Sequence, residues 1–92
     1  MAKYLMLCRY SLAGLKGMSA TRTKKAIIAI KKVGGKVDAM FALLGKYDLA
    51  FVIDFPSNAA AMKASIAITK MTGVGFLTSP ALTIQEFDKQ VV

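Results

Sequence analysis

The feature that most constrains the fold of this chain is the stretch 41–55, in which two apolar runs flank the pair Gly45-Lys46. A two-residue connection with glycine first suits a type II′ hairpin turn, because glycine reaches a positive φ at no steric cost. We therefore predict two adjacent antiparallel strands, Lys36–Leu44 and Tyr47–Phe55, joined by a tight turn.

The segments around this hairpin add one helix and one strand on each side. Ser19 is a suitable N-cap for a helix that ends at Gly34-Gly35, and Pro56 ends the second hairpin strand. Pro80 implies that the last strand is an edge strand or carries a bulge, and the conformation of 85–92 is left open. The predicted elements are strands over Lys3–Tyr10 and Phe76–Ile84, and helices from Ser19 to about Val33 and from Ser57 or Asn58 to about Met71.

This order, β-α-β-β-α-β, is the ferredoxin-like split motif of the α+β class. It predicts a single domain over residues 1–92, with a four-stranded antiparallel sheet and two helices on one face of it. The other face is left for solvent or for a partner.

Alternation along the hairpin divides its side chains between the two faces of the sheet. If Leu44 pairs with Tyr47, the bulkier set faces the helices and holds Phe55, Ile53, Phe51, Leu49, Tyr47, Met40, Ala42 and Leu44. The second set holds Asp54, Val52, Ala50, Asp48, Val37, Ala39, Phe41 and Leu43. Because this second face is apolar between two carboxylates, we expect a second copy to cover it in a sandwich or barrel-like dimer.

Composition narrows the choice of partner and compartment. The chain is 55% hydrophobic, yet its longest apolar run, Ala39–Leu44, is far shorter than the roughly 18 residues that cross a membrane. Burial of apolar surface between copies of the chain explains this composition better than insertion into a membrane does. With one cysteine and no recognisable signal peptide, a bacterial-type cytoplasmic setting fits best.

The hairpin carries the residues of a known family. Gly45, Tyr47 and Asp48 lie at its turn, and the chain resembles the GYD domain family, named for a glycine, a tyrosine and an aspartate at this place. Similar short segments are Lys3-Tyr4, Gly34-Gly35-Lys36, Phe55-Pro56 and Glu86-Phe87-Asp88. The resemblance implies a ferredoxin-like, dimeric α+β barrel and no defined activity. The basic segment 22–25 departs from a more acidic pattern in the family.

Two carboxylates are the candidate chemical groups. Asp48 and Tyr47 could act as base and donor, although a turn role for Gly45, Tyr47 and Asp48 is the favoured interpretation. Asp54 interrupts an apolar strand and needs a partner, for which Lys3, Arg9 and Lys36 are candidates. We hypothesise a small-molecule cleft between subunits that is flanked by Asp48 and Asp54 and lined by Tyr47, Phe41, Ala39, Ala50 and Val52.

Other chemistry finds little support in the sequence. The chain has no histidine, the commonest general base and metal ligand, so we predict no metal and no cofactor. Cys8 is expected to be an inert buried thiol, because no histidine could activate it. Gly34-Gly35-Lys36 precedes a strand, so it is not a phosphate loop.

The first helix presents a basic face to an anionic partner or to solvent: Arg22, Lys24, Lys25, Lys31 and Lys32. RNA-recognition domains share this topology, but their strand signature ends in an aromatic residue where this chain has Asp54. Nucleic-acid binding is therefore disfavoured despite the net charge of +8.

Two functions remain open. The first is a homo-oligomeric binding or assembly module that holds a small apolar ligand. The second is a cofactor-free enzyme, similar to a monooxygenase or an isomerase, that acts on a small hydrophobic substrate. The lack of histidine and the few acids favour the module.

Overall fold

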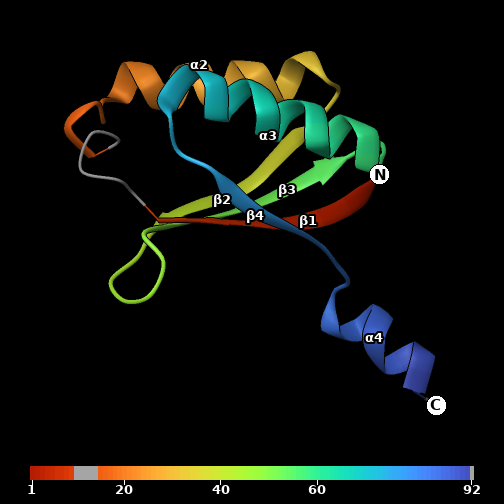
Figure 1. Cartoon of the computed structure of the whole chain (residues 1–92). Coiled ribbons are helices and arrows are strands. Elements are labelled where there is room, and N and C mark those ends of the chain that lie inside the picture. Colours follow the sequence, from red (N-terminus) through yellow and green to blue (C-terminus); the bar gives the residue numbers. More distant parts are fainter. Residues whose placement is uncertain (10–14, 92) are drawn as a thin grey trace.

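The structure is a computed structural model that describes residues 1–9 and 15–91. Its elements are β1 (Ala2–Cys8), α2 (Ala20–Lys32), β2 (Lys36–Ala42), β3 (Leu49–Phe55), α3 (Asn58–Thr72), β4 (Phe76–Ala81) and α4 (Ile84–Val91). The strands form one antiparallel sheet in the order β2-β3-β1-β4, with α2 and α3 on the same face (Figure 1). The predicted ferredoxin-like fold is confirmed. Tyr10, the predicted end of the first strand, lies outside the described residues.

Local signals set the ends of α2 and α3. The Ser19 hydroxyl accepts a hydrogen bond from the Arg22 amide at 3.1 Å, and the Ser57 hydroxyl accepts one from the Ala60 amide at 3.1 Å. Gly73 ends α3 with φ of 71°, in the left-handed conformation that glycine adopts without strain. Within the described residues, no helix combines the length and apolarity needed to cross a membrane.

The core lies between these helices and the sheet. Met6, Ile53 and Phe55 from the strands and Ile30 and Ile68 from the helices are buried completely or nearly so. Tyr4 packs edge-to-face on Phe55, with ring centroids 5.5 Å apart, and donates its hydroxyl proton to Asn58. The prediction that the bulkier set of β3 faces the helices is correct for Phe51, Ile53 and Phe55.

The hairpin register follows the prediction only in part. Ala42 pairs with Leu49 and Ala39 with Val52, as expected from the predicted pairing of Leu44 with Tyr47. The register then shifts between Val37 and Ala39. Val37 consequently pairs with Ile53 and packs against the core, so its predicted place on the second face is wrong. The extra residue is Asp38, and such a bulge re-aims side chains at a sheet edge.

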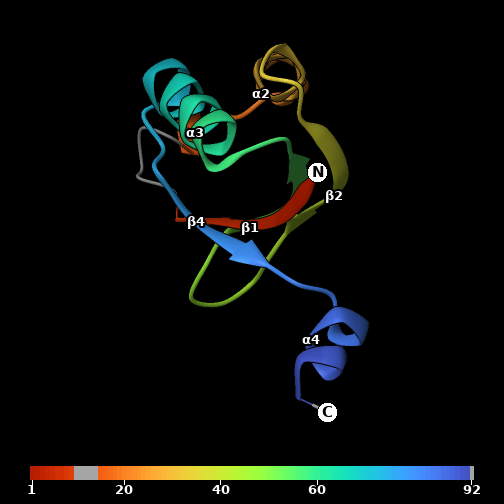
Figure 2. The ribbon, with the colours of Figure 1, turned by 90° about the vertical axis from the view of Figure 1, so that its right-hand side faces the viewer.

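The predicted two-residue turn is also wrong. The strands end at Ala42 and Leu49, one further bond joins the Leu43 amide to the Asp48 carbonyl at 2.8 Å, and residues 43–48 form a loop on the side of the sheet away from α2 and α3 (Figures 1 and 2). The Asp48 amide donates to the Cys8 carbonyl at 2.8 Å, a bond to β1 that opens the end of the hairpin. Gly45 has φ of 137°, well outside the type II′ geometry, but it is still the residue that needs positive φ.

The C-terminal segment forms a helix. β4 ends at Ala81, three residues before the predicted Ile84. Thr83 and Glu86 then make a reciprocal capping box: the Glu86 amide donates to the Thr83 hydroxyl at 3.1 Å, and the Thr83 amide donates to the Glu86 carboxylate at 3.4 Å. α4 stands away from the body, on the side of the sheet opposite α2 and α3 (Figures 1 and 2).

Candidate functional site

The sheet face opposite α2 and α3, here called the open face, is apolar over two consecutive rows of side chains. The strand registers place Phe41, Ala50, Leu7 and Leu77 in one row and Ala39, Val52, Leu5 and Ser79 in the next. Leu5, Phe41 and Leu77 are exposed in the single chain, by 36%, 57% and 57%. Such a contiguous apolar surface marks a site of interaction.

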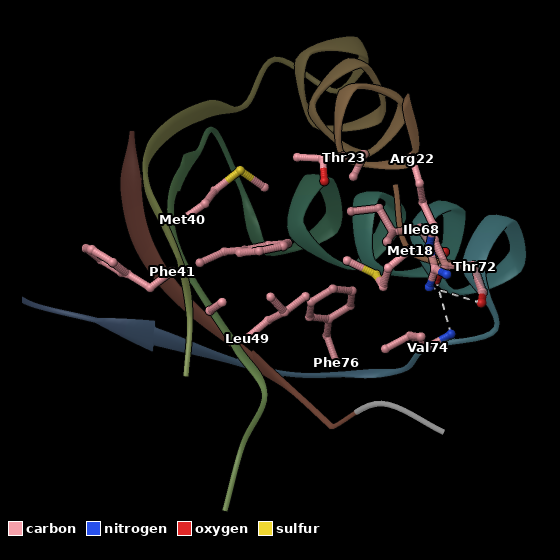
Figure 3. Close-up of a pocket in the computed structure, with 13 residues that line it drawn as sticks. Met18, Arg22, Thr23, Met40, Phe41, Leu49, Ile68, Thr72, Val74 and Phe76 are labelled. Atoms are coloured by element: carbon pink, nitrogen blue, oxygen red, sulfur yellow. Dashed lines mark hydrogen bonds between the residues drawn. The ribbon is translucent and has the colours of Figure 1, made fainter. Parts of the chain in front are cut away.

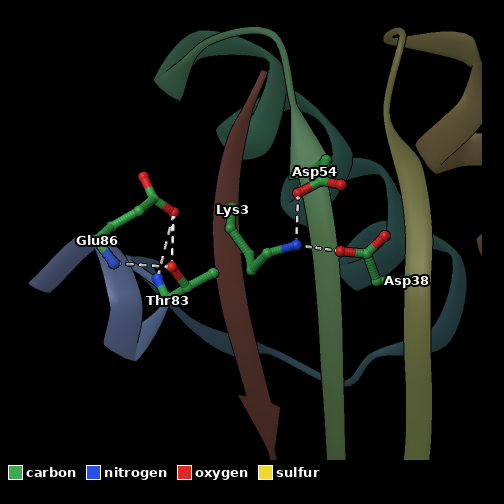
Figure 4. Close-up of polar contacts among 5 residues, drawn as sticks. All are labelled: Lys3, Asp38, Asp54, Thr83 and Glu86. Carbon is green, nitrogen blue, oxygen red and sulfur yellow. Dashed lines mark hydrogen bonds and ion pairs between the residues drawn. The ribbon is translucent and has the colours of Figure 1, made fainter.

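A third row, at one end of the open face, is polar (Figure 4). The Lys3 ammonium lies 3.0 Å from the Asp54 carboxylate and also contacts Asp38, the bulge residue. Of the three predicted partners of Asp54, the structure therefore selects Lys3. The hydrogen bond from Lys3 holds the pKa of Asp38 below its ordinary 3.8, and the two carboxylates raise the pKa of Lys3. The stabilisation from Asp38 is thus present above pH 3.8 and is lost as the pH falls through the lowered pKa.

The structure brings together part of the predicted ligand site. Ala39, Ala50, Val52 and Phe41 are neighbours on the open face, and Asp54 flanks them from the polar row. Tyr47 and Asp48 lie in the loop at the other end of β3, where Lys46 approaches the ring of Tyr47 to 5.8 Å. Gly45, Tyr47 and Asp48 therefore share this loop and not a tight turn.

A second site lies on the other side of the sheet, where it meets α2 and α3. It is a cavity of about 150 Å³ (Figure 3). The residues that line it are mostly apolar: Met18, Ala26, Met40, Phe41, Ala42, Leu49, Phe51, Ile68, Val74 and Phe76, with Arg22, Thr23 and Thr72. Phe41 borders the cavity although its ring points away from it, toward the open face (Figure 3). We call it the helix-side cavity. No pattern in the sequence indicated this cavity.

Arg22 supplies the positive charge in this lining. Its Nη2 donates to the Thr72 carbonyl oxygen at 3.3 Å, at the C-terminal end of α3, where a cation complements the helix dipole. Arg22 therefore turns toward the cavity, whereas Lys24, Lys25, Lys31 and Lys32 are exposed. Arg22, Ala26 and Ile30 follow one another at intervals of four residues, and Ala26 and Ile30 are buried. This spacing indicates that Arg22 lies on the inner face of α2.

Cys8 is buried on the helix side of β1, as predicted, with 2% of its surface exposed. Burial and, to a smaller extent, the nearby Asp48 charge raise the pKa of its thiol to about 11. At pH 8 only about one thiol in a thousand is then ionised.

We expect the Cys8 thiol to resist iodoacetamide at pH 8 in the native protein and to react readily in 8 M urea, because only the exposed thiolate is a good nucleophile. Mass spectrometry of timed samples would measure both rates. Equal rates in the two conditions would contradict the buried, protonated thiol.

The described residues 1–9 and 15–91 contain no group of three or more acidic, cysteine or histidine side chains that could hold a metal ion.

Comparison with known proteins identifies a family and a fold. The profile of the GYD domain matches residues 4–91. A search of curated protein sequences finds no match. Among solved structures, the chain is similar to the leucine response regulatory protein of Mycobacterium tuberculosis, with a TM-score of 0.57 and 10% sequence identity. That similarity covers 89% of this chain and 51% of the regulator, so this chain spans about half of the regulator's length.

Proposed function

The chain belongs to the GYD domain family, and within that family we propose that it is a self-associating, non-catalytic module that binds a small apolar molecule. The helix-side cavity is the observation that carries the binding function. The open face supports self-association through a second copy. A regulator named for its response to leucine has a similar fold, which agrees with a role in small-molecule response.

The size and lining of the cavity define the ligand class. Its volume of about 150 Å³ equals that of an engineered apolar cavity that stays dry and binds benzene. Met40, Phe51 and Phe76 contribute apolar side chains to the wall. We therefore assign to this cavity an apolar ligand with about six non-hydrogen atoms.

The lining also supports binding without catalysis. Its polar side chains are those of Arg22, Thr23 and Thr72, and a guanidinium offers hydrogen-bond donors and no acceptor. Asp54 is paired with Lys3 on the other side of the sheet, so this carboxylate does not reach the cavity as a base.

Benzene is the test ligand for the helix-side cavity. We expect saturable shifts in the ¹H–¹⁵N spectrum, concentrated on cavity residues such as Phe51 and Ile68. Ala26→Met should abolish these shifts, because Ala26 is buried in the cavity wall and the longer side chain would fill it. The substitution should cost about 1–3 kcal/mol through overpacking.

Two variants serve as controls for this experiment. Ala59→Met makes the same change at an exposed position of α3 and should bind benzene normally. Ala42→Met alters the cavity from an exposed strand residue and should weaken binding without the cost of core overpacking. Unsaturable or dispersed shifts in the wild-type protein, or unchanged binding in both cavity variants, would refute the proposed site.

A further inference from the structure

α4 is a well-formed helix whose apolar side chains are left uncovered by the described residues 1–9 and 15–91. The Thr83–Glu86 capping box fixes its start, yet none of its residues is buried. Ile84, Phe87 and Val91 follow the spacing of one helix face and are exposed by 70%, 53% and 68%. Because isolated helices shorter than about 12 residues are marginal in water, an eight-residue helix with an apolar stripe requires a surface to cover it.

A complementary surface lies on the outside of the helical layer. The groove between α2 and α3 has a volume of about 600 Å³, and Ile28, Ala67 and Met71 are among the apolar residues that line it. Lys25, Lys32 and Lys63 line it as well. We call it the lysine groove. It combines apolar side chains with three ammonium groups.

The charges of α4 match those of the lysine groove. α4 carries Glu86 and Asp88 against a single Lys89, in a chain whose net charge is +8. Asp88 borders the apolar stripe, since it lies four residues after Ile84 and three before Val91. An amphipathic helix seated in a groove with its acids beside lysines is a common mode of recognition.

We propose that α4 of one copy docks in the lysine groove of a second copy. Within one chain the contact is impossible as folded, because the sheet lies between α4 and the outer surface of α2 and α3 (Figures 1 and 2). The open face is a poorer seat for an acidic helix, since the ammonium groups of its polar row, on Lys3 and Lys36, are balanced by the carboxylates of Asp38 and Asp54.

The contact of α4 with the lysine groove is a second contact within the proposed self-association, and it rests on that proposal. It involves neither the helix-side cavity nor the open face. Benzene binding and open-face pairing can therefore fail while the α4 contact holds, and the reverse is also true.

Site-specific crosslinking of mixed full-length variants tests the contact. One preparation carries Gln90→Cys, beside the apolar stripe of α4, and the other carries Ala67→Cys in the lysine groove. With a short bismaleimide, we expect the mixture to give a crosslinked dimer that neither preparation gives alone. Asp88→Lys in the α4 partner should lower the yield on the order of tenfold through like-charge contact with the groove lysines. Cys8 is buried, and the wild-type protein measures any background from it.

Two further cysteines make the result decisive. Lys89→Cys projects from the opposite side of α4 and should crosslink to Ala67→Cys several-fold more slowly. Ser79→Cys reports the alternative seat on the open face. A crosslink of Gln90→Cys to Ser79→Cys in preference to Ala67→Cys, or no crosslink to either, would overturn the proposal.

Discussion

Leu5→Asp is expected to break the pairing of two copies through the open face, with a solution mass that falls from that of the wild-type protein toward the 9.9 kDa of one chain. Leu5 lies in the interior of the open face, between Val52 on β3 and Ser79 on β4. Pairing of two such faces would bury the introduced carboxylate in an apolar layer without a partner, which costs several kcal/mol. The dissociation constant should therefore rise by at least about 100-fold, since 2.8 kcal/mol already gives that factor.

Light scattering after size-exclusion chromatography, across a dilution series, measures this effect. Ile66→Asp is the matched control, because it places the same charge on an exposed apolar position of α3, outside the open face. It should leave the mass unchanged, and circular dichroism would verify that both variants fold. A wild-type protein of 9.9 kDa at all concentrations, or equal masses for the wild type and Leu5→Asp, would refute pairing through the open face.

Among alanine substitutions at the glycines Gly34, Gly35, Gly45, Gly73 and Gly75, Gly35→Ala is expected to be the most destabilising. A Cβ at this position would lie 2.7 Å from Ile30 Cγ2, 2.9 Å from the Ile30 carbonyl oxygen and 2.9 Å from Phe55 Cε1. Ile30 and Phe55 are fully buried, so neither side chain can move aside without disturbing the core. We expect a loss of about 3 kcal/mol in the free energy of unfolding.

Urea denaturation would measure the loss, and Gly75→Ala provides the control. A Cβ at Gly75 meets no atom within 4 Å, so this variant should stay within about 0.5 kcal/mol of the wild type. If both variants have the same midpoint, the junction of α2 and β2 can relax, and close packing is not the reason for a glycine at position 35.

The sequence predicts the element order because the signals for it are local. Ser19 and Ser57 cap the two helices as expected, and Pro80 lies in an edge strand. Errors arise where a distant group decides the geometry. The amide of Asp48 bonds to Cys8 on β1, which opens the predicted tight turn. The bulge at Asp38, whose carboxylate contacts Lys3, shifts the register at the other end of the hairpin.

The candidate site was predictable to a similar extent. Alternation along the hairpin identified Ala39, Ala50 and Val52 as neighbours on one face, and the interrupted apolar pattern identified Asp54 as needing a partner. The helix-side cavity depends on how side chains from α2, α3 and three strands fill space, which no local pattern specifies. α4 did leave a readable signal, because Thr83-Ile-Gln-Glu86 is the sequence of a capping box.

Pro80 limits the edge-to-edge pairing of sheets from different copies of this protein. It lies in β4, an outer strand, and has no N–H to offer a strand from another molecule. At the opposite border, the bulge in β2 interrupts the regular ladder that an incoming strand would need. Continuous cross-β growth into fibrils is therefore obstructed at both borders. These two features protect the sheet edges of a small, basic and strongly apolar chain against edge-to-edge aggregation.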